Sequence, residues 1–110
     1  MTRREVVLPG DPALPGYARA VLAVVEAIPP GKVLTYGDVA ELLEAGGPRQ
    51  VGAVMARYGA AVPWWRVVNA AGVLPPGLRG TAARQYRAEG TAYDESGERV
   101  RLRVARWDGS

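Results

Sequence analysis

Apolar residues recur with helical spacing in the first third of the chain. The segment 17–28 carries them at i, i+1, i+4 and i+7, which predicts a helix with one apolar face. The buried positions of this helix are expected to be Val21, Leu22, Val25 and Ile28. The Pro-Pro-Gly sequence at 29–31 ends the pattern. Residues 1–15 are rich in proline and predict an irregular arm, so we expect a single domain over 16–110.

Two short helices separated by a tight turn are predicted next. Thr35 is suited to N-cap a helix over 36–44, whose buried face would carry Val39, Leu42 and Leu43. A glycine pair follows, and Pro48 is suited to the first position of a third helix over 49–57. The inner side of this helix would carry Val51, Val54 and Met55. Two short helices around a glycine-containing turn are typical of a helix-turn-helix.

The outer face of the third helix carries only small or uncharged side chains. Its residues are Gln50, Gly52, Ala53 and Ala56. A glycine inside a helix costs about 1 kcal/mol relative to alanine, which calls for a reason. Either the smooth surface allows close approach to a partner, or Gly52 lets the preceding helix pack tightly.

Two consecutive tryptophans stand at the centre of the chain. Pro63 precedes Trp64 and Trp65, and the β-branched pair at 67–68 favours extended structure. Neighbouring side chains on an extended segment point to opposite sides, so one indole can be buried while the other lines a pocket. The alternative is that both are core residues of a protein without phenylalanine.

The C-terminal third predicts a loop, a helix and a hairpin. Residues 72–80 form the loop, and a helix over 82–89 ends at Gly90. A strand over 91–93 and a turn over 94–97 lead to a strand over 99–104, with inward Val100, Leu102 and Val104 and outward Arg99, Arg101 and Arg103. These arginines fit phosphate contacts or a solvated edge equally well. The fold is therefore expected to be mainly α with short β, a winged helix-turn-helix-like DNA-binding domain with a C-terminal β-hairpin.

Composition removes several kinds of chemistry. The 110 residues include no cysteine and no histidine, which excludes disulfides, thiol nucleophiles and Ser-His-Asp triads. We therefore expect no metal and no cofactor. The start of the chain does not resemble a signal peptide and no apolar run reaches membrane-spanning length, so we expect a cytoplasmic monomer with no membrane contact. The net charge is +3, and all cations except Lys32 are arginines. This composition fits either a partner that is an acidic polymer or the codon usage of a GC-rich genome.

Three ordered motifs within residues 17–90 resemble one family. The segment 28–37, Ile-Pro-Pro-Gly-Lys-Val-Leu-Thr-Tyr-Gly, looks like the opening of the DNA-binding domain of O⁶-alkylguanine-DNA alkyltransferases. The segment 49–55, Arg-Gln-Val-Gly-Ala-Val-Met, resembles the recognition helix of that domain. The segment 63–68, Pro-Trp-Trp-Arg-Val-Val, resembles the active-site Pro-Cys-His-Arg-Val.

The departures from this family change the expected chemistry. Trp64 stands where the alkyl-accepting cysteine would be, which is the signature of alkyltransferase-like proteins. An indole carbon lacks the nucleophilicity of a thiolate, so we expect no alkyl transfer and no enzyme activity. Trp65 replaces the family's histidine. Glu89 resembles the glutamate that partners this histidine, and is expected to accept from the indole N–H or from Arg66.

The resemblance implies base flipping in duplex DNA that contains O⁶-alkylguanine. Tyr36 matches the tyrosine that turns the nucleotide out, and Arg49 matches the finger that fills the vacancy. The smooth surface of Gln50, Gly52 and Ala53 would enter the minor groove. The flipped base would lie among Tyr36, Pro63, Trp64, the backbone N–H of Val67 and Arg79, with Trp65, Arg66 and Glu89 as supporting residues.

The predicted function is thus a non-enzymatic sensor that flags the lesion for nucleotide excision repair proteins, a partner implied by resemblance alone. One alternative is a winged-helix transcription regulator, which would need more base-reading side chains than Gln50 on its recognition helix. An enzyme that uses Tyr36 or Glu89 is disfavoured, because no histidine, cysteine or evident carboxylate pair accompanies them.

Overall fold

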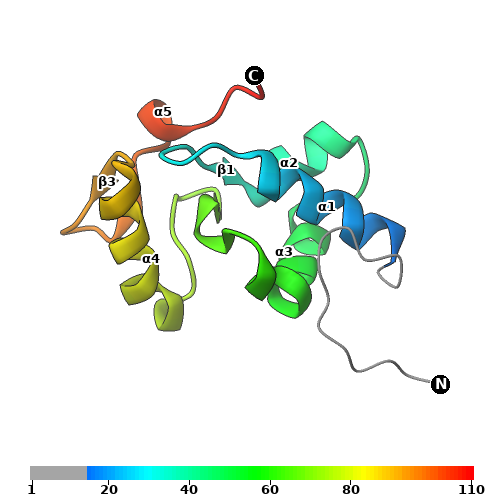
Figure 1. The fold of residues 1–110 in the computed structure, drawn as a ribbon, viewed down its shortest axis with the longest axis horizontal. Helices are drawn as coiled ribbons and strands as arrows, with labels where there is room; N and C mark the ends of the chain where they lie inside the picture. Colours follow the sequence, from blue (N-terminus) through cyan, green and yellow to red (C-terminus); the bar gives the residue numbers. More distant parts are fainter. Residues whose placement is uncertain (1–14) are drawn as a thin grey trace.

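The computed structural model describes residues 15–110. The arm predicted for residues 1–15 therefore lies, except for Pro15, outside the described residues. The chain order of the elements is α1 (Gly16–Ala27), β1 (Leu34–Thr35), α2 (Tyr36–Leu43), α3 (Pro48–Tyr58), the 3₁₀ turns η1 (Gly59–Ala61) and η2 (Trp64–Arg66), β2 (Val67–Val68), α4 (Pro76–Glu89), β3 (Tyr93–Asp94), β4 (Arg99–Val100) and α5 (Leu102–Ala105) (Figure 1). The mainly helical fold with short strands is as predicted.

One hydrophobic core joins α1, α2 and α3. Val21, Leu22 and Val25 of α1 are fully buried, as their spacing predicted, and they belong to the same cluster as Val39 and Val51. The prediction that Leu42 is buried is wrong, because its side chain is 51% exposed and Ala40 is buried in its place. The reason is geometric: α2 has only eight residues, and Val39, Ala40 and Leu43 already form the arc that faces the core.

A second core joins α4 to the C-terminal segments. Its buried residues are Val33, Val68, Leu74, Ala82, Tyr86, Val100 and Ala105. The parallel pair of β1 and β2 connects the two cores, with Leu34 opposite Val67 and Thr35 opposite Val68. Thr35 thereby fixes the start of α2 against the segment that carries the tryptophans.

The helix starts follow the predicted signals. The Thr35 hydroxyl accepts from the Asp38 N–H at 3.0 Å, and the Asp38 carboxylate accepts from the Thr35 N–H at 2.9 Å, which forms a complete capping box. Pro48 occupies the first turn of α3, and Gly90 ends α4 in the left-handed conformation. These local signals were correct because each one acts within its own turn: the caps satisfy backbone groups that the helix leaves unpaired, and proline lacks an N–H that would have no partner there.

The strand predicted over 99–104 is wrong beyond Val100. Leu102–Ala105 is the short helix α5, and Val104 is 64% exposed instead of facing inward. The chain turns here because the end of α5 and the residues after it pair with Val33, which directly precedes β1: the Val33 N–H donates to the Ala105 carbonyl at 2.9 Å, and the Trp107 N–H donates to the Val33 carbonyl at 2.8 Å. The predicted row of three arginines on one strand face is therefore not formed.

The loop predicted over 72–80 is also partly wrong, since α4 begins at Pro76 rather than at Ala82. Gly77 and Gly80 lie in this extra turn, where a Cβ on either would meet nothing within 4 Å. Proline at the start of a helix is favourable, and the packing of Ala82, Ala83 and Tyr86 stabilises the helix despite its glycines. Within residues 15–110, no helix is long and apolar enough to cross a membrane.

Candidate nucleic-acid interface and base cavity

Tyr36 is the first residue of α2 and lies directly after the capping residue Thr35. Its ring is half-buried and packs against the first core. Burial raises the pKa of Tyr36 above its ordinary value, so the hydroxyl stays protonated and able to donate at neutral pH. The capping box therefore holds a neutral donor at the start of the helix-turn-helix.

The outward face of α3 is exposed, as predicted. Arg49, Gln50 and Ala53 are exposed and Gly52 is half-exposed. A Cβ on Gly52 would meet nothing within 4 Å, so tight helix packing does not explain this glycine. Gln50 also has a structural role, because its carboxamide oxygen accepts from the Gly47 N–H at 3.0 Å and fixes the turn before α3.

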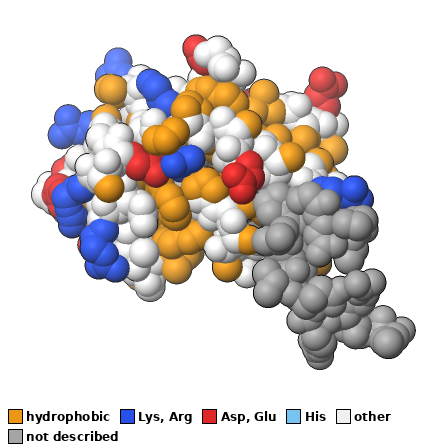
Figure 2. All heavy atoms as spheres, viewed as in Figure 1, with side chains coloured by type: hydrophobic (Ala, Val, Ile, Leu, Met, Phe, Trp, Pro, Cys, Tyr) orange, Lys and Arg blue, Asp and Glu red, His pale blue; other side chains and the backbone are white. Residues whose placement is uncertain are grey.

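A cavity of about 330 Å³ opens between α3, the 3₁₀ turns and the start of α4. Its lining residues are Tyr36, Gly52, Met55, Ala56, Gly59, Ala60, Trp64, Leu74, Pro75 and Leu78. Apolar side chains lie at the surface between α3 and α4 in the face shown in Figure 2. The volume is at the small end of the range for cavities that bind organic ligands. Tyr36 and Trp64, two of the predicted pocket residues, meet here, together with Gly52 of the predicted DNA-binding surface.

Three other predicted pocket residues do not line this cavity. Val67 is fully buried, and its N–H donates to the Trp64 carbonyl within η2, so it has no free donor for a base. Arg79 lies on α4, where its Nε donates to the Leu74 carbonyl at 2.7 Å and its Nη1 lies 3.4 Å from the Glu98 carboxylate. Pro63 is half-buried at the N-cap of η2.

Sequence reasoning missed the small residues after α3 and the apolar residues before and within the first turn of α4. Gly59 and Ala60 continue the smooth surface of α3, and this run of small residues was the available signal. Leu74, Pro75 and Leu78 were hidden by the prediction of an open loop over 72–80. The signal there was Pro76, which is suited to the first turn of a helix.

The tryptophan pair adopts a 3₁₀ turn instead of the predicted extended conformation. The ring centroids of Trp64 and Trp65 lie 5.5 Å apart with an interplanar angle of 84°, an edge-to-face contact. The two side chains nevertheless differ in environment. Trp64 lines the cavity, while the Trp65 indole N–H donates to a Glu89 carboxylate oxygen at 2.9 Å.

Glu89 connects three segments behind the tryptophans. Its carboxylate accepts from Arg66 Nε at 3.1 Å and Nη2 at 2.7 Å, and from the Gly31 N–H at 3.2 Å. Both predicted partners of Glu89, the indole of Trp65 and Arg66, are thus confirmed. Burial alone would raise the pKa of Glu89, but the hydrogen bonds from Arg66, Trp65 and Gly31 and the charge of Arg66 hold it below its ordinary value. Arg66 also donates to the Ile28 carbonyl at 2.9 Å.

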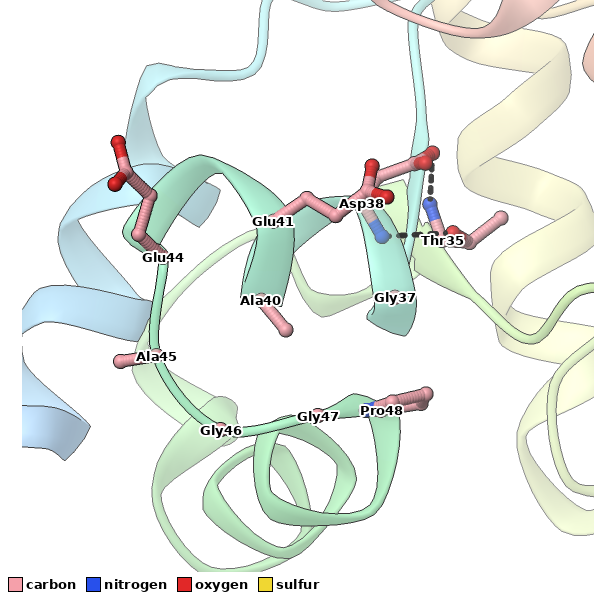
Figure 3. A pocket seen from close by; sticks show the side chains of 10 residues that line it. All are labelled: Thr35, Gly37, Asp38, Ala40, Glu41, Glu44, Ala45, Gly46, Gly47 and Pro48. Carbon is pink, nitrogen blue, oxygen red and sulfur yellow. Dashed lines mark hydrogen bonds between the residues drawn. The ribbon is translucent and has the colours of Figure 1, made fainter.

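A second, more open cavity of about 700 Å³ lies between α2 and the turn before α3 (Figure 3). Ala40 points into it, whereas the carboxylates of Asp38, Glu41 and Glu44 point away from the gap. Negative charge around this opening repels phosphates. By contrast, α3 contains no acidic residue, and Arg49 and the small residues of its outer face are exposed.

The chain is similar to proteins of known family. Residues 16–90 match the family described as 6-O-methylguanine DNA methyltransferase, DNA binding domain. The DNA base-flipping protein of Escherichia coli K12 is 42% identical over 101 residues, which cover 84% of this chain and 74% of that protein. The DNA base-flipping protein of Vibrio parahaemolyticus is 35% identical over 96 residues, which cover 79% of this chain and 91% of that protein.

Solved structures show the same fold. The crystal structure of S. pombe Atl1 in complex with damaged DNA containing O⁶-carboxymethylguanine matches with a TM-score of 0.71 and 29% identity, over 84% of this chain and 94% of that chain. The crystal structure of a Mycobacterium tuberculosis OGT variant matches with a TM-score of 0.61 and 26% identity, over 68% of this chain and 48% of that chain. The similarity therefore spans nearly all of the S. pombe chain but only about half of the mycobacterial one.

Proposed function

Because this chain belongs to the 6-O-methylguanine DNA methyltransferase DNA-binding domain family, as an alkyltransferase-like protein, we propose that it binds O⁶-alkylguanine in duplex DNA and holds the base flipped. The relatives named as DNA base-flipping proteins and the Atl1 complex with damaged DNA support this proposal. The single observation that carries it is the cavity between Tyr36 and Trp64, which opens beside the smooth outer face of α3.

In the proposed complex, the exposed face of α3 lies in the minor groove. Gln50, Gly52 and Ala53 allow the helix to approach the duplex closely, since none of them carries a charge or a large apolar group. Arg49, exposed at the N-terminal end of α3, enters the base stack and replaces the extruded nucleotide. Tyr36 crowds the backbone of that nucleotide, and its neutral hydroxyl donates to the base edge.

The flipped base then lies in the cavity against Trp64. Extrusion costs a few kcal/mol and costs least for a damaged base, so part of the lesion preference comes from the duplex itself. The indole face adds apolar surface for the O⁶ substituent, although one methyl group contributes only about 1 kcal/mol. Preference for the lesion is therefore the sum of easier extrusion and apolar contact.

We propose that no alkyl transfer follows. Trp64 occupies the position that resembles the acceptor cysteine, and the chain contains neither cysteine nor histidine. Among the described residues that line the cavity, Tyr36 carries the only hydroxyl, and its raised pKa makes it a poor nucleophile. The lesion would remain on the DNA for nucleotide excision repair proteins, a partner supported only by the family resemblance.

The experiment that tests this proposal is a pair of fluorescence-anisotropy titrations at one stated salt concentration. The two duplexes are identical except for one O⁶-methylguanine. We expect tighter binding to the modified duplex, and we expect the duplex recovered afterwards to be still methylated. Equal affinity for the two duplexes would contradict lesion recognition and favour the sequence-reading regulator instead, while demethylated product would contradict the absence of transfer.

A further inference from the structure

The α4 side of the base cavity is apolar. Leu74 and Pro75 precede the helix and Leu78 lies in its first turn. Leu78 is 42% exposed and is one of the few large apolar side chains that the described structure leaves open to solvent. Among the described residues that line the cavity, none carries a charge. An apolar substituent that covers Leu78 removes apolar surface from water, which is favourable.

The arginines near this wall are bound elsewhere. Arg79 follows Leu78 directly, but its Nε donates to the Leu74 carbonyl at 2.7 Å and its Nη1 lies 3.4 Å from Glu98. Arg66, from the tryptophan segment, is held by Glu89 and by the Ile28 carbonyl. Neither guanidinium is among the groups that line the cavity.

The start of α4 supplies few donors to an anion. Helix N-termini generally attract negative charge through their free N–H groups. Here Pro76 has no N–H, and the Leu78 N–H donates to the Pro75 carbonyl at 2.9 Å. Two of the first three residues of the helix therefore offer no free donor to a carboxylate that enters the cavity. A carboxylate that enters the cavity loses its hydrogen bonds to water and gains contacts with apolar carbon atoms, which is strongly unfavourable.

We propose that this cavity selects uncharged, apolar O⁶ substituents and discriminates against a carboxylate, with Leu78 as the residue that sets the preference. The inference rests on the proposed function, because it concerns what the flipped base carries. O⁶-carboxymethylguanine, which is present in the Atl1 complex, is the informative anionic lesion. O⁶-isobutylguanine is its neutral counterpart, since the two substituents have the same branched shape and nearly the same size.

The test is an anisotropy titration of the full chain with three duplexes: unmodified, O⁶-isobutylguanine and O⁶-carboxymethylguanine. We expect the affinity for the isobutyl duplex to be at least about tenfold higher than the affinity for the carboxymethyl duplex. A negative charge added to the DNA is small beside the charge of the backbone, so non-specific binding is expected to be the same for all three.

Three variants identify the residue responsible. Leu78→Arg places a cation at the cavity and should raise affinity for the carboxymethyl duplex about tenfold relative to the isobutyl duplex. Leu78→Met keeps an apolar side chain of similar size and should leave the preference unchanged. Val104→Arg adds the same charge at an exposed position on α5 and should not change the ratio of the two affinities. Both positions are exposed, so we expect all three variants to fold, and thermal unfolding of each variant checks this.

Three results separate the failure of the inference from the failure of the proposed function. If the two lesion duplexes bind equally and both bind more tightly than the unmodified duplex, the preference is overturned while lesion binding stands. A carboxymethyl affinity that falls selectively in Arg79→Ala would also overturn it, by showing that this arginine turns into the cavity. Equal affinity for all three duplexes would overturn the proposed function itself.

Discussion

At the level of single residues, Trp65 and Glu89 support the cavity that Tyr36 and Trp64 line. Trp64 contacts Trp65 edge to face, and Trp65 is in turn held by the Glu89 carboxylate and by Tyr86, whose hydroxyl donates to the Trp65 carbonyl at 2.6 Å. Arg66 lies over the Trp65 ring at 5.7 Å and also binds Glu89. The orientation of the cavity wall therefore depends on residues that do not line the cavity themselves.

Trp65→Phe tests this support. The substitution keeps an aromatic ring but removes the N–H that donates to Glu89, so we expect a loss of about 1.5–3 kcal/mol in the free energy of unfolding. Urea denaturation measures it. Trp65→His is the matched control, because an imidazole N–H can replace the donor. A histidine variant as unstable as the phenylalanine variant would show that ring packing, not the hydrogen bond, is what matters.

Glu89 gives a pH dependence with a defined sign. Its pKa is held below the ordinary value in the folded state, so its contribution to stability is present above the unfolded-state pKa and is lost as pH falls through the folded-state pKa. We expect Glu89→Gln to destabilise the protein at pH 7 and to differ little from the unsubstituted protein at strongly acidic pH. Urea denaturation at both pH values checks this. A difference that stays constant with pH would contradict it.

At the scale of elements, the segment between β2 and α4 is fixed by the C-terminal hairpin. The Val100 N–H donates to the Gly72 carbonyl at 2.8 Å, and the Asn69 side chain accepts from the N–H groups of Ala71 and Val73. Gly72 has a φ of +83°, and a Cβ there would lie 2.5 Å from the Val100 carbonyl oxygen. The turn that leads to Leu74 and the cavity therefore needs glycine.

Gly72→Ala and Gly80→Ala should have opposite effects. We expect Gly72→Ala to destabilise the protein by more than about 1 kcal/mol, because it combines a left-handed φ with a backbone clash. Gly80 lies inside α4 with open space around it, so alanine there should stabilise by about 0.5–1 kcal/mol. Thermal unfolding of the two variants compares them. Equal changes in stability for the two variants would show that the turn at Gly72 can rearrange and that the contact with Val100 does not constrain it.

Elements specified by local chemistry could be predicted from the sequence, and elements specified by distant contacts could not. The capping box at Thr35 and Gly90 at the end of α4 satisfy backbone groups within one turn, and Pro48 lacks an N–H that would be unpaired at the start of α3. Residue types alone therefore identified all three. The end of β4 at Val100 could not be predicted, because it depends on pairing between Val33 and the segment after α5. The alternation over 99–104 is compatible with a strand, but tertiary pairing decides the structure.

The same distinction applies to the candidate site. The resemblance grouped Tyr36 with Trp64, which line one cavity. It also singled out Glu89, and the donors that replace the family's histidine followed from side-chain chemistry. Arg79 does not reach that cavity, because the helix start at Pro76 carries it onto α4, where it binds Leu74 and Glu98. The position of Arg79 depends on where α4 begins. The glycine- and proline-rich segment 72–80 predicted a loop and did not reveal the helix start at Pro76.

Across the whole molecule, the arginines are spread over different parts of the surface. Arg49 is on α3, and Arg103 is on α5, which lies on the other side of β1 in Figure 1. Basic side chains also lie along the end of the molecule formed by α4 and the hairpin, in the face shown in Figure 2. If DNA binds along α3, Arg49 contacts the site of the flipped nucleotide and Arg103 does not.

Arg49→Ala and Arg103→Ala separate the two surfaces. Both side chains are exposed, so each substitution should change stability by less than about 0.5 kcal/mol. We expect Arg49→Ala to weaken binding to a duplex with O⁶-methylguanine at least about tenfold, since the vacancy in the stack is left unfilled. Arg103→Ala should change affinity little. Anisotropy titrations at one salt concentration compare them, and retained affinity in Arg49→Ala would count against an inserted finger.

Base flipping is tested most directly by a measurement of base extrusion in the complex. A fluorescent cytosine analogue, whose emission rises when it is unpaired, is placed opposite O⁶-methylguanine, and emission is recorded while anisotropy confirms saturation. We expect emission to increase on binding to this duplex, to change little with an unmodified guanine, and to increase less with saturating Arg49→Ala. Saturated binding to the lesion with no change in emission would contradict base flipping.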